Sequence, residues 1–253
     1  EMNLQNSFAS LEGWNGTISG ITLNNFFGIE IDDFAHEIAK LSLYLAQHQI
    51  NKKFEEEFGK LKPTLPLKES GKIVCGNSTR VDWNEVCPRK DQFGNEHEIY
   101  VAGNPPFEGS RKQGDEHKME LTYIFQNYTK IYKSLDYVSI WYFKMAQYIS
   151  AYKLVKGALV STNSITQGEQ VSLLWPIIFS QGVEISFGYR SFKWKNLAKG
   201  NAGVTCVIIG LSNPEKRKKR IYNNERYFDV NEINPYLTEG KTVFVYSRNK
   251  PLS

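Results

Sequence analysis

Short apolar runs alternate along the chain with longer stretches in which apolar residues recur every three or four positions. The first run, residues 26–31, ends in acid and leads into a helical pattern from Phe34 to about Ile50. The apolar residues on one face of that pattern are Phe34, Ile38, Leu41 and Leu45. Such a stripe is typical of a helix that faces a core, with Asp32 or Asp33 as its amino-terminal cap. We therefore expect a strand, an acidic tip and a core-facing helix.

The same alternation continues to about residue 210. Further strands are predicted at residues 72–75, 98–103, 157–161, 183–187 and 204–210. Helices are predicted at residues 134–152 and 167–180, the second interrupted by Pro176. The last two strands are expected to pair in antiparallel fashion. Strands that alternate with helices predict an α/β fold, with a largely parallel sheet covered on both faces.

Polar and charged segments separate these elements. Residues 52–62 contain three consecutive glutamates and are expected to form a solvated connector. Residues 108–118 are polar and contain glycine, which predicts a mobile loop. The basic run at 216–220 is interpreted as a solvated loop, with contact to phosphates as the alternative.

Polar side chains follow three of the predicted strands. Glu30, Asn77 and Asn104 stand at or just beyond the ends of the first, second and third strand. In open parallel sheets, ligands bind outside the carboxyl ends of the strands. The three residues are therefore candidates for one binding site.

The third strand stops at an Asn-Pro-Pro-Phe corner, residues 104–107. Two prolines fix φ near −65° and remove two N–H donors, so the turn is stiff and its carbonyls remain free to accept hydrogen bonds. An amide, rigid acceptor carbonyls and an aromatic ring would together suit a planar base that carries an amino group. An ordinary surface turn is the alternative, and the four residues alone do not decide between them.

Composition narrows the class of protein only slightly. With 253 residues, of which 41% are hydrophobic, the chain is long enough to bury a sizeable core. The net charge of +4 is compatible with a polyanionic partner but does not require one. Three cysteines without C-x-x-C spacing fit a reducing cytoplasm and argue against a zinc site. No run approaches eighteen apolar residues and no leader is recognisable, so neither a membrane span nor a secretory signal is predicted.

Several segments together resemble a known family. Residues 27–32, 75–78 and 102–107 look like the second, third and fourth motifs of adenine-specific DNA methyltransferases. Residues 159–170 and 187–194 are similar to later segments of the single-chain restriction-modification enzymes, in which methylation and cleavage share one polypeptide. The resemblance covers roughly residues 20–250. It implies a class I methyltransferase (Rossmann-like) fold, mostly parallel with an antiparallel last strand.

The resemblance also implies S-adenosylmethionine as the cofactor. Glu30, with Ile31 beside it, would bind the ribose hydroxyls, and a helix-capping role for Glu30 is the alternative. Asn77 stands where the family usually has Asp, and its amide oxygen would accept a hydrogen bond from the adenine amino group of the cofactor. Ser78 would lie alongside, although a simple turn role is as plausible. Asn104 is expected to border the cofactor as well, and no metal is implied.

The family's chemistry would place double-stranded DNA, with an adenine flipped from the helix, at the corner. Asn104 Oδ1 and the Pro105 carbonyl would accept the two hydrogens of the adenine amino group, Pro106 would stiffen the turn, and Phe107 would stack on the base. The candidates for a DNA-facing rim are the cations interleaved with aromatic residues, namely Arg190, Lys193 and Lys195. Aromatic residues that face the core are the alternative there.

The family's first motif, an acidic glycine-rich loop after the first strand, has no match in the chain. We therefore expect a catalytic core truncated at both ends, which lacks the first strand. Residues 1–213 would form the partial catalytic domain, and residues 214–253 a connector toward an absent target-recognition domain. Such a piece is expected to be inactive alone and to bind the cofactor weakly or not at all. The rival hypotheses are methylation of RNA or of a glutamine side chain, and a catalytically silent DNA-binding module.

Overall fold

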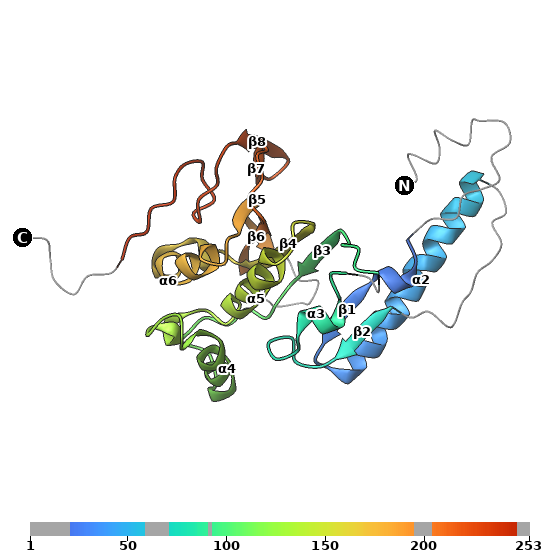
Figure 1. Ribbon diagram of the computed structural model, residues 1–253, viewed down its shortest axis with the longest axis horizontal. Coiled ribbons are helices and arrows are strands. Elements are labelled where there is room, and N and C mark those ends of the chain that lie inside the picture. Colours follow the sequence, from blue (N-terminus) through green and yellow to red (C-terminus); the bar gives the residue numbers. More distant parts are fainter. Residues whose placement is uncertain (1–20, 59–70, 91–92, 195–203, 247–253) are drawn as a thin grey trace, which may run out of the picture. The chain divides into compact units, whose positions relative to one another are not determined.

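The computed structural model describes residues 21–58, 71–90, 93–194 and 204–246. The chain divides into two compact units, Glu1–Pro88 and Arg89–Ser253. The α-helices and strands of both units are labelled in Figure 1, and each unit is described by itself.

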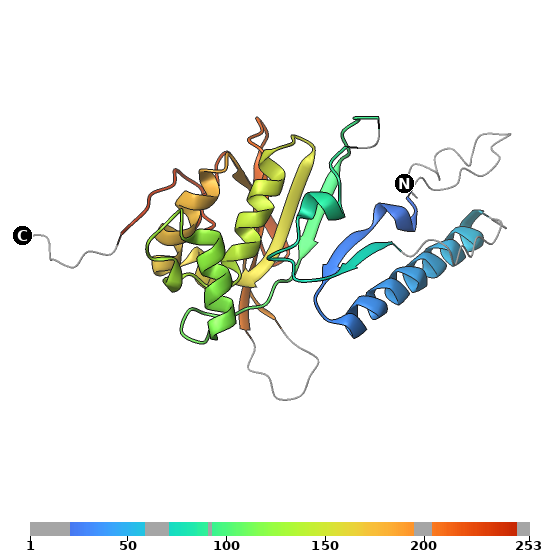
Figure 2. The ribbon, with the colours of Figure 1, turned by 60° about the horizontal axis from the view of Figure 1, so that its bottom comes forward.

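The smaller unit is built on two short parallel strands. A 3-10 turn, η1 (Leu23–Asn25), precedes β1 (Phe27–Glu30), which pairs with β2 (Lys72–Cys75) so that Glu30 lies opposite Cys75. The long helix α2 (Asp33–Phe58) lies along both strands, and α3 (Trp83–Val86) follows β2 (Figure 2). Both predicted strands are confirmed in position; β2 has the predicted bounds, and β1 is one residue shorter at each end than the apolar run at 26–31.

Helix α2 begins where the sequence predicts but continues further. Asp32 caps it, because its Oδ1 accepts a hydrogen bond from the Ala35 N–H at 2.8 Å. The helix then runs through residues 52–58, so the prediction of a solvated connector is wrong for that part. On its inner side His36 is buried, and its Nε2 lies 3.0 Å from the Ile73 carbonyl of β2.

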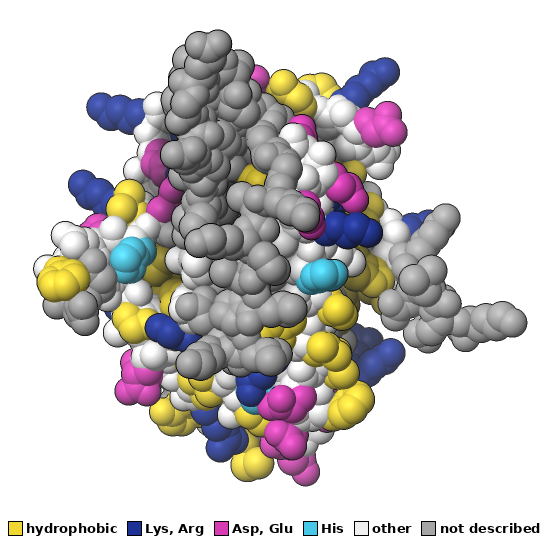
Figure 3. Space-filling view, turned by 90° about the vertical axis from the view of Figure 1, so that its right-hand side faces the viewer, with side chains coloured by type: hydrophobic (Ala, Val, Ile, Leu, Met, Phe, Trp, Pro, Cys, Tyr) yellow, Lys and Arg dark blue, Asp and Glu magenta, His cyan; other side chains and the backbone are white. Residues whose placement is uncertain are grey.

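The face of α2 that points inward differs from the predicted one. The four residues of the predicted stripe are all exposed: Phe34 by 76%, Ile38 by 43%, Leu41 by 51% and Leu45 by 54%. His36 and Phe54 are buried instead, and Leu43 is half-buried. The prediction failed because α2 carries apolar residues on more than one side, while two strands cover only one of them. In Figure 3, hydrophobic side chains lie among charged ones on the surface that is drawn.

The larger unit contains a six-stranded sheet in the order β3-β4-β6-β5-β7-β8. The bounds of its strands are β3 Ile99–Gly103, β4 Val155–Thr162, β5 Glu184–Trp194, β6 Val204–Ser212, β7 Lys219–Asn223 and β8 Arg226–Val230. Strands β3, β4, β5 and β7 run in one direction, and β6 and β8 run in the other. The antiparallel pairing of β5 with β6, predicted from the sequence, is confirmed.

Strands β7 and β8 extend this sheet where a solvated loop was expected. Lys219 opens β7 with its side chain buried, and its ammonium group lies 2.6 Å from the Glu184 carboxylate on β5. Arg220 is the second residue of the strand and pairs with Asp229 on β8. The loop prediction is therefore wrong for Lys219 and Arg220. The predicted boundary at residue 213 stays a prediction, although the sheet continues past it.

Helix α5 (Ser139–Ser150) forms the centre of the core of this unit. It packs on β4 and β6 and against α6 (Gly168–Phe179), so both helices lie on one face of the sheet (Figure 2). A Cβ atom at Gly157 of β4 would lie 2.5 Å from the Met145 sulfur, which explains the glycine. Lys156 and Val160 of β4 point to the opposite face of the sheet and are only half-buried. In the described part of this unit, α5 and α6 thus cover one face of the sheet rather than both.

The remaining helical elements are short. They are α4 (Asp115–Phe125) and the 3-10 turns η2 (Tyr132–Ser134) and η3 (Asn163–Thr166). Helix α6 runs on through Pro176, where an interruption was expected, and Trp175 and Ile178 on either side are fully buried. Among the described residues, no helix combines the length and the apolar character that crossing a membrane requires.

Candidate active site

The Asn-Pro-Pro-Phe corner follows directly on β3, at the carboxyl end of the strand. Pro105 is buried and Phe107 half-buried, whereas Asn104 and Pro106 are exposed. Within the described part of the chain, neither the Asn104 amide nor the Pro105 carbonyl takes part in a hydrogen bond. The corner thus has a packed inner side and presents acceptors that the fold itself does not use.

Backbone contacts fix the segment just after the corner. The Glu108 carbonyl accepts hydrogen bonds from the Tyr137 N–H at 2.8 Å and from Gln113 Nε2 at 3.2 Å. The same Gln113 nitrogen donates to the Leu135 carbonyl at 2.9 Å, and the Gln113 side chain is buried. Since residues of the 134–137 segment hold this backbone, the corner is anchored by a distant part of the sequence.

The side chain of Glu108 belongs to a second set of contacts. Its Oε2 lies 2.7 Å from His117 Nδ1, and the His117 ring stacks on Tyr137 with 4.1 Å between centroids. Tyr137 in turn donates its hydroxyl hydrogen to the buried Glu120 at 2.5 Å. Burial, and then the Glu120 carboxylate, raise the pKa of Tyr137, so the phenol remains a hydrogen-bond donor. Because α4 begins at Asp115, the last residues of the predicted loop are helical.

In the smaller unit, Glu30 ends β1 with its carboxylate half-exposed. Its Oε1 accepts a hydrogen bond from the Asp32 N–H at 3.1 Å. Since Asp32 supplies the cap of α2, the helix-capping alternative for Glu30 loses its support. The neighbouring Ile31 side chain is 67% exposed. A carboxylate with unused acceptor capacity therefore stands beside an exposed apolar side chain.

Asn77 and Ser78 form a turn beyond β2. Asn77 Oδ1 accepts hydrogen bonds from the N–H and the hydroxyl of Thr79, at 2.9 and 2.7 Å. The Ser78 carbonyl accepts from Trp83 Nε1 at 2.9 Å. The amide oxygen expected to meet the cofactor is thus engaged within its own turn. The turn role weighed for Ser78 has direct support, and a cofactor role for either residue stays a prediction.

Parallel pairing brings the predicted residues together in two groups. In the smaller unit Glu30 lies opposite Cys75, just ahead of Asn77. In the larger unit Gly103, the residue before the corner, lies opposite Leu159 of β4. The carboxyl ends of β3 and β4 are therefore neighbours.

The residues whose hydrogen bonds connect the segments after β3 and β4 were not identified from the sequence. These residues are Gln113, Asp136, Ser164 and Gln170. Asp136 was assigned to a helix, which begins only at Ser139. An acidic side chain within a strongly apolar stretch was the available signal, since buried acids need partners.

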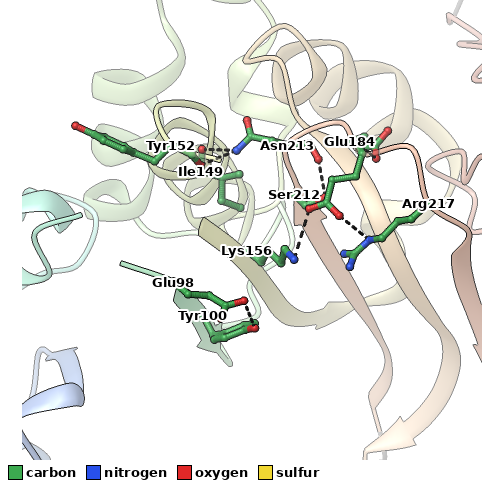
Figure 4. Close-up of polar contacts among 10 residues, drawn as sticks. Glu98, Tyr100, Ile149, Tyr152, Lys156, Glu184, Ser212, Asn213 and Arg217 are labelled. Carbon is green, nitrogen blue, oxygen red and sulfur yellow. Dashed lines mark hydrogen bonds and ion pairs between the residues drawn. The ribbon is translucent and has the colours of Figure 1, made fainter. Parts of the chain in front are cut away.

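A different polar cluster occupies the opposite ends of these strands (Figure 4). Glu215 pairs with Lys156 at 3.5 Å and with Arg217 at 2.7 Å, and the Tyr100 hydroxyl donates to Glu98 at 2.5 Å. Nearby, Asn213 Nδ2 donates to the Ile149 and Tyr152 carbonyls and so closes the end of α5. Every charge in this cluster has a partner within it, which fits a stabilising role.

The predicted DNA-facing rim lies on β5. Arg190 Nε donates to the Leu237 carbonyl at 3.1 Å, so this side chain also anchors the turn that follows β8. Lys193 is exposed, and Lys195 lies outside the described residues. Tyr189 stacks on Tyr222 of β7 at 6.2 Å. The DNA-binding role of the three cations stays a prediction. Among the described residues, no group of three histidine, cysteine or acidic side chains is placed to hold a metal ion.

A sheet in which antiparallel β6 lies between β4 and β5, with an Asn-Pro-Pro-Phe corner after β3, defines a methyltransferase-type α/β domain. The chain belongs to the family described as "MmeI, DNA-methyltransferase domain", whose model matches residues 1–223. It is 47% identical over 255 residues to "DNA methyltransferase A" of Bacillus subtilis (strain 168), covering 100% of this chain and 28% of that protein. The resemblance found in the sequence is thereby confirmed.

A solved structure gives the same assignment. The type IIL restriction-modification enzyme MmeI in complex with DNA matches with a TM-score of 0.85 and 40% identity. The match covers 96% of this chain and 33% of that one. The predicted α/β class I methyltransferase fold is therefore confirmed. The chain spans about a third or less of the length of these relatives.

Proposed function

We propose that the chain is the catalytic part of a restriction-modification protein that transfers a methyl group from S-adenosylmethionine to the N6 amino group of adenine in DNA. The observation that carries the proposal is the corner at residues 104–107, where the exposed Asn104 amide and the Pro105 carbonyl have no hydrogen-bond partner among the described residues. A rigid pair of acceptors at a strand end suits an exocyclic amino group.

The chemistry requires a more nucleophilic amino nitrogen. The lone pair of adenine N6 is delocalised into the ring, and acceptors on both amino hydrogens favour a pyramidal nitrogen that localises it. Asn104 Oδ1 and the Pro105 carbonyl are the acceptors that we assign. Phe107 would stack on the flipped base, which contributes roughly 1–3 kcal/mol against the cost of unstacking. The remaining task of these residues is alignment, so no nucleophilic side chain is needed.

The cofactor site fits the smaller unit in part. The Glu30 carboxylate has acceptor capacity to spare for two ribose hydroxyls, and the exposed Ile31 beside it offers an apolar surface for the adenine ring. Asn77 fits less well, because its amide oxygen is already engaged with Thr79. When bound, S-adenosylmethionine supplies the activated methyl group. Our assignment of the cofactor site therefore rests mainly on Glu30.

An unpaired strand edge in each unit suggests what the intact protein adds. Strand β1 pairs with β2 alone and β3 pairs with β4 alone among the described strands, which leaves one edge of each unpaired. We propose that further segments of the polypeptide supply the strand and glycine-rich loop of the family's first motif. We assign double-stranded DNA as the partner, with Arg190 and Lys193 of β5 as candidate contacts and Lys195 as a candidate from the sequence alone.

The test uses the intact protein, duplex DNA and tritiated S-adenosylmethionine, followed by separation of the nucleosides. We expect label in N6-methyladenine, and Asn104→Ala should abolish it because one of the two acceptors is removed. Asn127→Ala, at an exposed asparagine of the larger unit, is the matched control and should retain activity. Label in RNA or in a glutamine-containing peptide in place of DNA would favour the rival amino-methyltransferases. Undiminished methylation by Asn104→Ala would overturn the catalytic assignment.

A further inference from the structure

A buried carboxylate lies between the two loops that leave β3 and β4. Asp136 is 7% exposed. Its Oδ1 lies 3.3 Å from the Ser110 N–H, just beyond the corner, and its Oδ2 accepts a hydrogen bond from the Ser164 hydroxyl at 2.5 Å. One side chain thus spans two loops, with a different oxygen for each.

The backbone around Asp136 is held as firmly as its side chain. The Asp136 N–H donates to Gln170 Oε1 at 3.0 Å, and Gln170 Nε2 donates to the Ser134 carbonyl at 2.7 Å. On its other side, the Tyr137 N–H donates to the Glu108 carbonyl. The position of the carboxylate is therefore set by α6 and by the segment after the corner, since Gln170 lies in the first turn of α6.

The loop that Ser164 belongs to is the natural neighbour of the corner. Strands β3 and β4 are parallel and in register, with Gly103 opposite Leu159, so their carboxyl ends emerge side by side. The Ser164 hydroxyl also lies 2.7 Å from that of Thr162. A shift of either loop would lengthen one of the two contacts to Asp136.

We infer that Asp136 is a positioning residue for methyl transfer. It holds the Ser110 end of the corner loop at a fixed place relative to the Thr162–Ser164 loop, and through this it sets the position of Asn104 and Pro105. The inference rests on the proposed function, because it concerns the same corner. Reactions that depend on alignment are sensitive to displacements of this kind, and a misplacement of about 1 Å slows them by about a hundredfold.

The variants at position 136 are chosen by their hydrogen-bonding capacity. Ionised Asp accepts with both oxygens, whereas alanine has no acceptor, so both contacts are lost in Asp136→Ala. Asn can keep both, because its amide oxygen accepts from the Ser110 N–H while its NH₂ group donates to the Ser164 hydroxyl oxygen. In Ser164→Ala, only the second contact is lost. Ser164→Thr keeps the hydroxyl.

The experiment measures single-turnover methyl transfer by the intact protein, together with the dissociation constants for S-adenosylmethionine and DNA and the melting temperature. Asp136→Ala and Ser164→Ala should each slow methyl transfer by about 10- to 100-fold while both dissociation constants stay within about twofold. Ser164→Thr should restore most of the rate. The double variant should be little slower than Asp136→Ala, because Asp136→Ala already breaks the contact that Ser164→Ala removes.

Tyr100→Phe serves as the matched control. It removes a hydroxyl bonded to a carboxylate at a similar distance, but at the opposite end of β3, and it should leave the rate unchanged. Wild-type rates in Asp136→Ala and Ser164→Ala, with Asn104→Ala inactive, would overturn this inference and leave the proposed function standing. Parallel losses of affinity, melting temperature and rate would also overturn it, since they indicate a merely structural role. If Asn104→Ala is fully active, the proposed function fails first.

Discussion

The loops that carry the two groups of candidate residues contain different kinds of contact. In the turn after β2, the hydrogen bonds from Thr79 to Asn77 and from Trp83 to the Ser78 carbonyl join residues at most five apart in the sequence. The loop after β3 is held by the distant segment 135–137, since Gln113 donates to the Leu135 carbonyl, the Ser110 N–H to Asp136, and the Tyr137 N–H to the Glu108 carbonyl. Its direct backbone contact with Asp136 joins residues 26 apart in the sequence.

This difference separates two requirements of the proposed reaction. A cofactor can be bound by a loop that forms locally, because its affinity depends on contacts that the loop itself supplies. Alignment of a base with a donor depends on where the whole loop stands in the domain, and such precision comes from rigid surroundings. We therefore expect changes around the β3 loop to act on the rate, and changes around the β2 loop to act on affinity.

Among the changes to hydrogen bonds that hold the two loops, the largest effect is expected for Gln113→Leu. This change removes both side-chain hydrogen bonds of Gln113, and the Leu135 carbonyl loses the partner that Gln113 provides. An unsatisfied buried carbonyl costs about 1–3 kcal/mol. The free energy of unfolding in urea should fall by that amount, and single-turnover methyl transfer by at least about tenfold.

Gln126→Leu is the matched control for this prediction. Gln126 follows α4 directly and is exposed, so the same change of side chain should alter stability by less than about 0.5 kcal/mol. If the two variants behave alike, the loop after β3 is not braced by Gln113, and the contrast between the loops disappears.

The second prediction concerns Asn77 in the turn after β2. Asn77→Ala removes the two hydrogen bonds from Thr79 and should cost about 1 kcal/mol. Affinity for S-adenosylmethionine, measured by calorimetry on the intact protein, should fall, while the rate at saturating cofactor stays close to wild type. Asn77→Asp should behave like wild type, because a carboxylate accepts both bonds. A reduced rate at saturation would contradict the separation of roles.

The same contrast explains which features the sequence revealed. Strands β1 and β2 and the corner after β3 were found because an apolar run that stops at a polar or proline residue is a local signal. Asp136 was not found as a brace, since its partner Ser164 lies 28 residues away. Likewise, the basic residue Lys219 was taken for a loop residue, but its partner Glu184 lies 35 residues away and draws it into the sheet.

Helix α2 shows a further limit of pattern reading. Its start was predicted correctly from Asp32, a capping residue whose hydrogen bond is formed within three residues. Its inward face was not predicted correctly. Whether His36 or Phe34 faces inward depends on where β2 lies, and the spacing of apolar residues along the helix does not contain that information. Long-range packing therefore decides both the brace of the active-site loop and the orientation of the helix.

A third prediction tests β4, the strand that pairs with β3. The buried Tyr142 hydroxyl donates to the Leu159 carbonyl at 2.9 Å, and Tyr142→Phe should cost about 1 kcal/mol at neutral pH. Burial raises the pKa of Tyr142 above its ordinary value of 10.0, so the folded state keeps a proton that the unfolded state releases. The stability that the raised pKa of Tyr142 contributes is fully present below pH 10 and is lost as the pH rises further.

The measurement for Tyr142 compares wild type and Tyr142→Phe by urea unfolding at several pH values. The free energy of unfolding of wild type should exceed that of Tyr142→Phe by a constant amount up to about pH 10. Above that pH the difference should shrink, because phenylalanine has no proton to lose. Tyr123→Phe, at an exposed tyrosine of α4, is the control and should show no such change. If the difference in free energy of unfolding grew above pH 10, it would contradict a raised pKa for Tyr142.

The smallest effect is expected on the outer face of α2. Leu41 is 51% exposed, and Leu41→Ala should change the free energy of unfolding by less than about 0.5 kcal/mol, because little apolar surface leaves the protein interior. Phe54, which is 9% exposed on the inner face, is the comparison, and Phe54→Ala should cost about 3–5 kcal/mol. Both variants are measured by urea unfolding of the intact protein. A loss of 2 kcal/mol or more in Leu41→Ala, about the value of a buried leucine, would mean that this face is covered there and that the inward and outward sides of α2 have been assigned too simply.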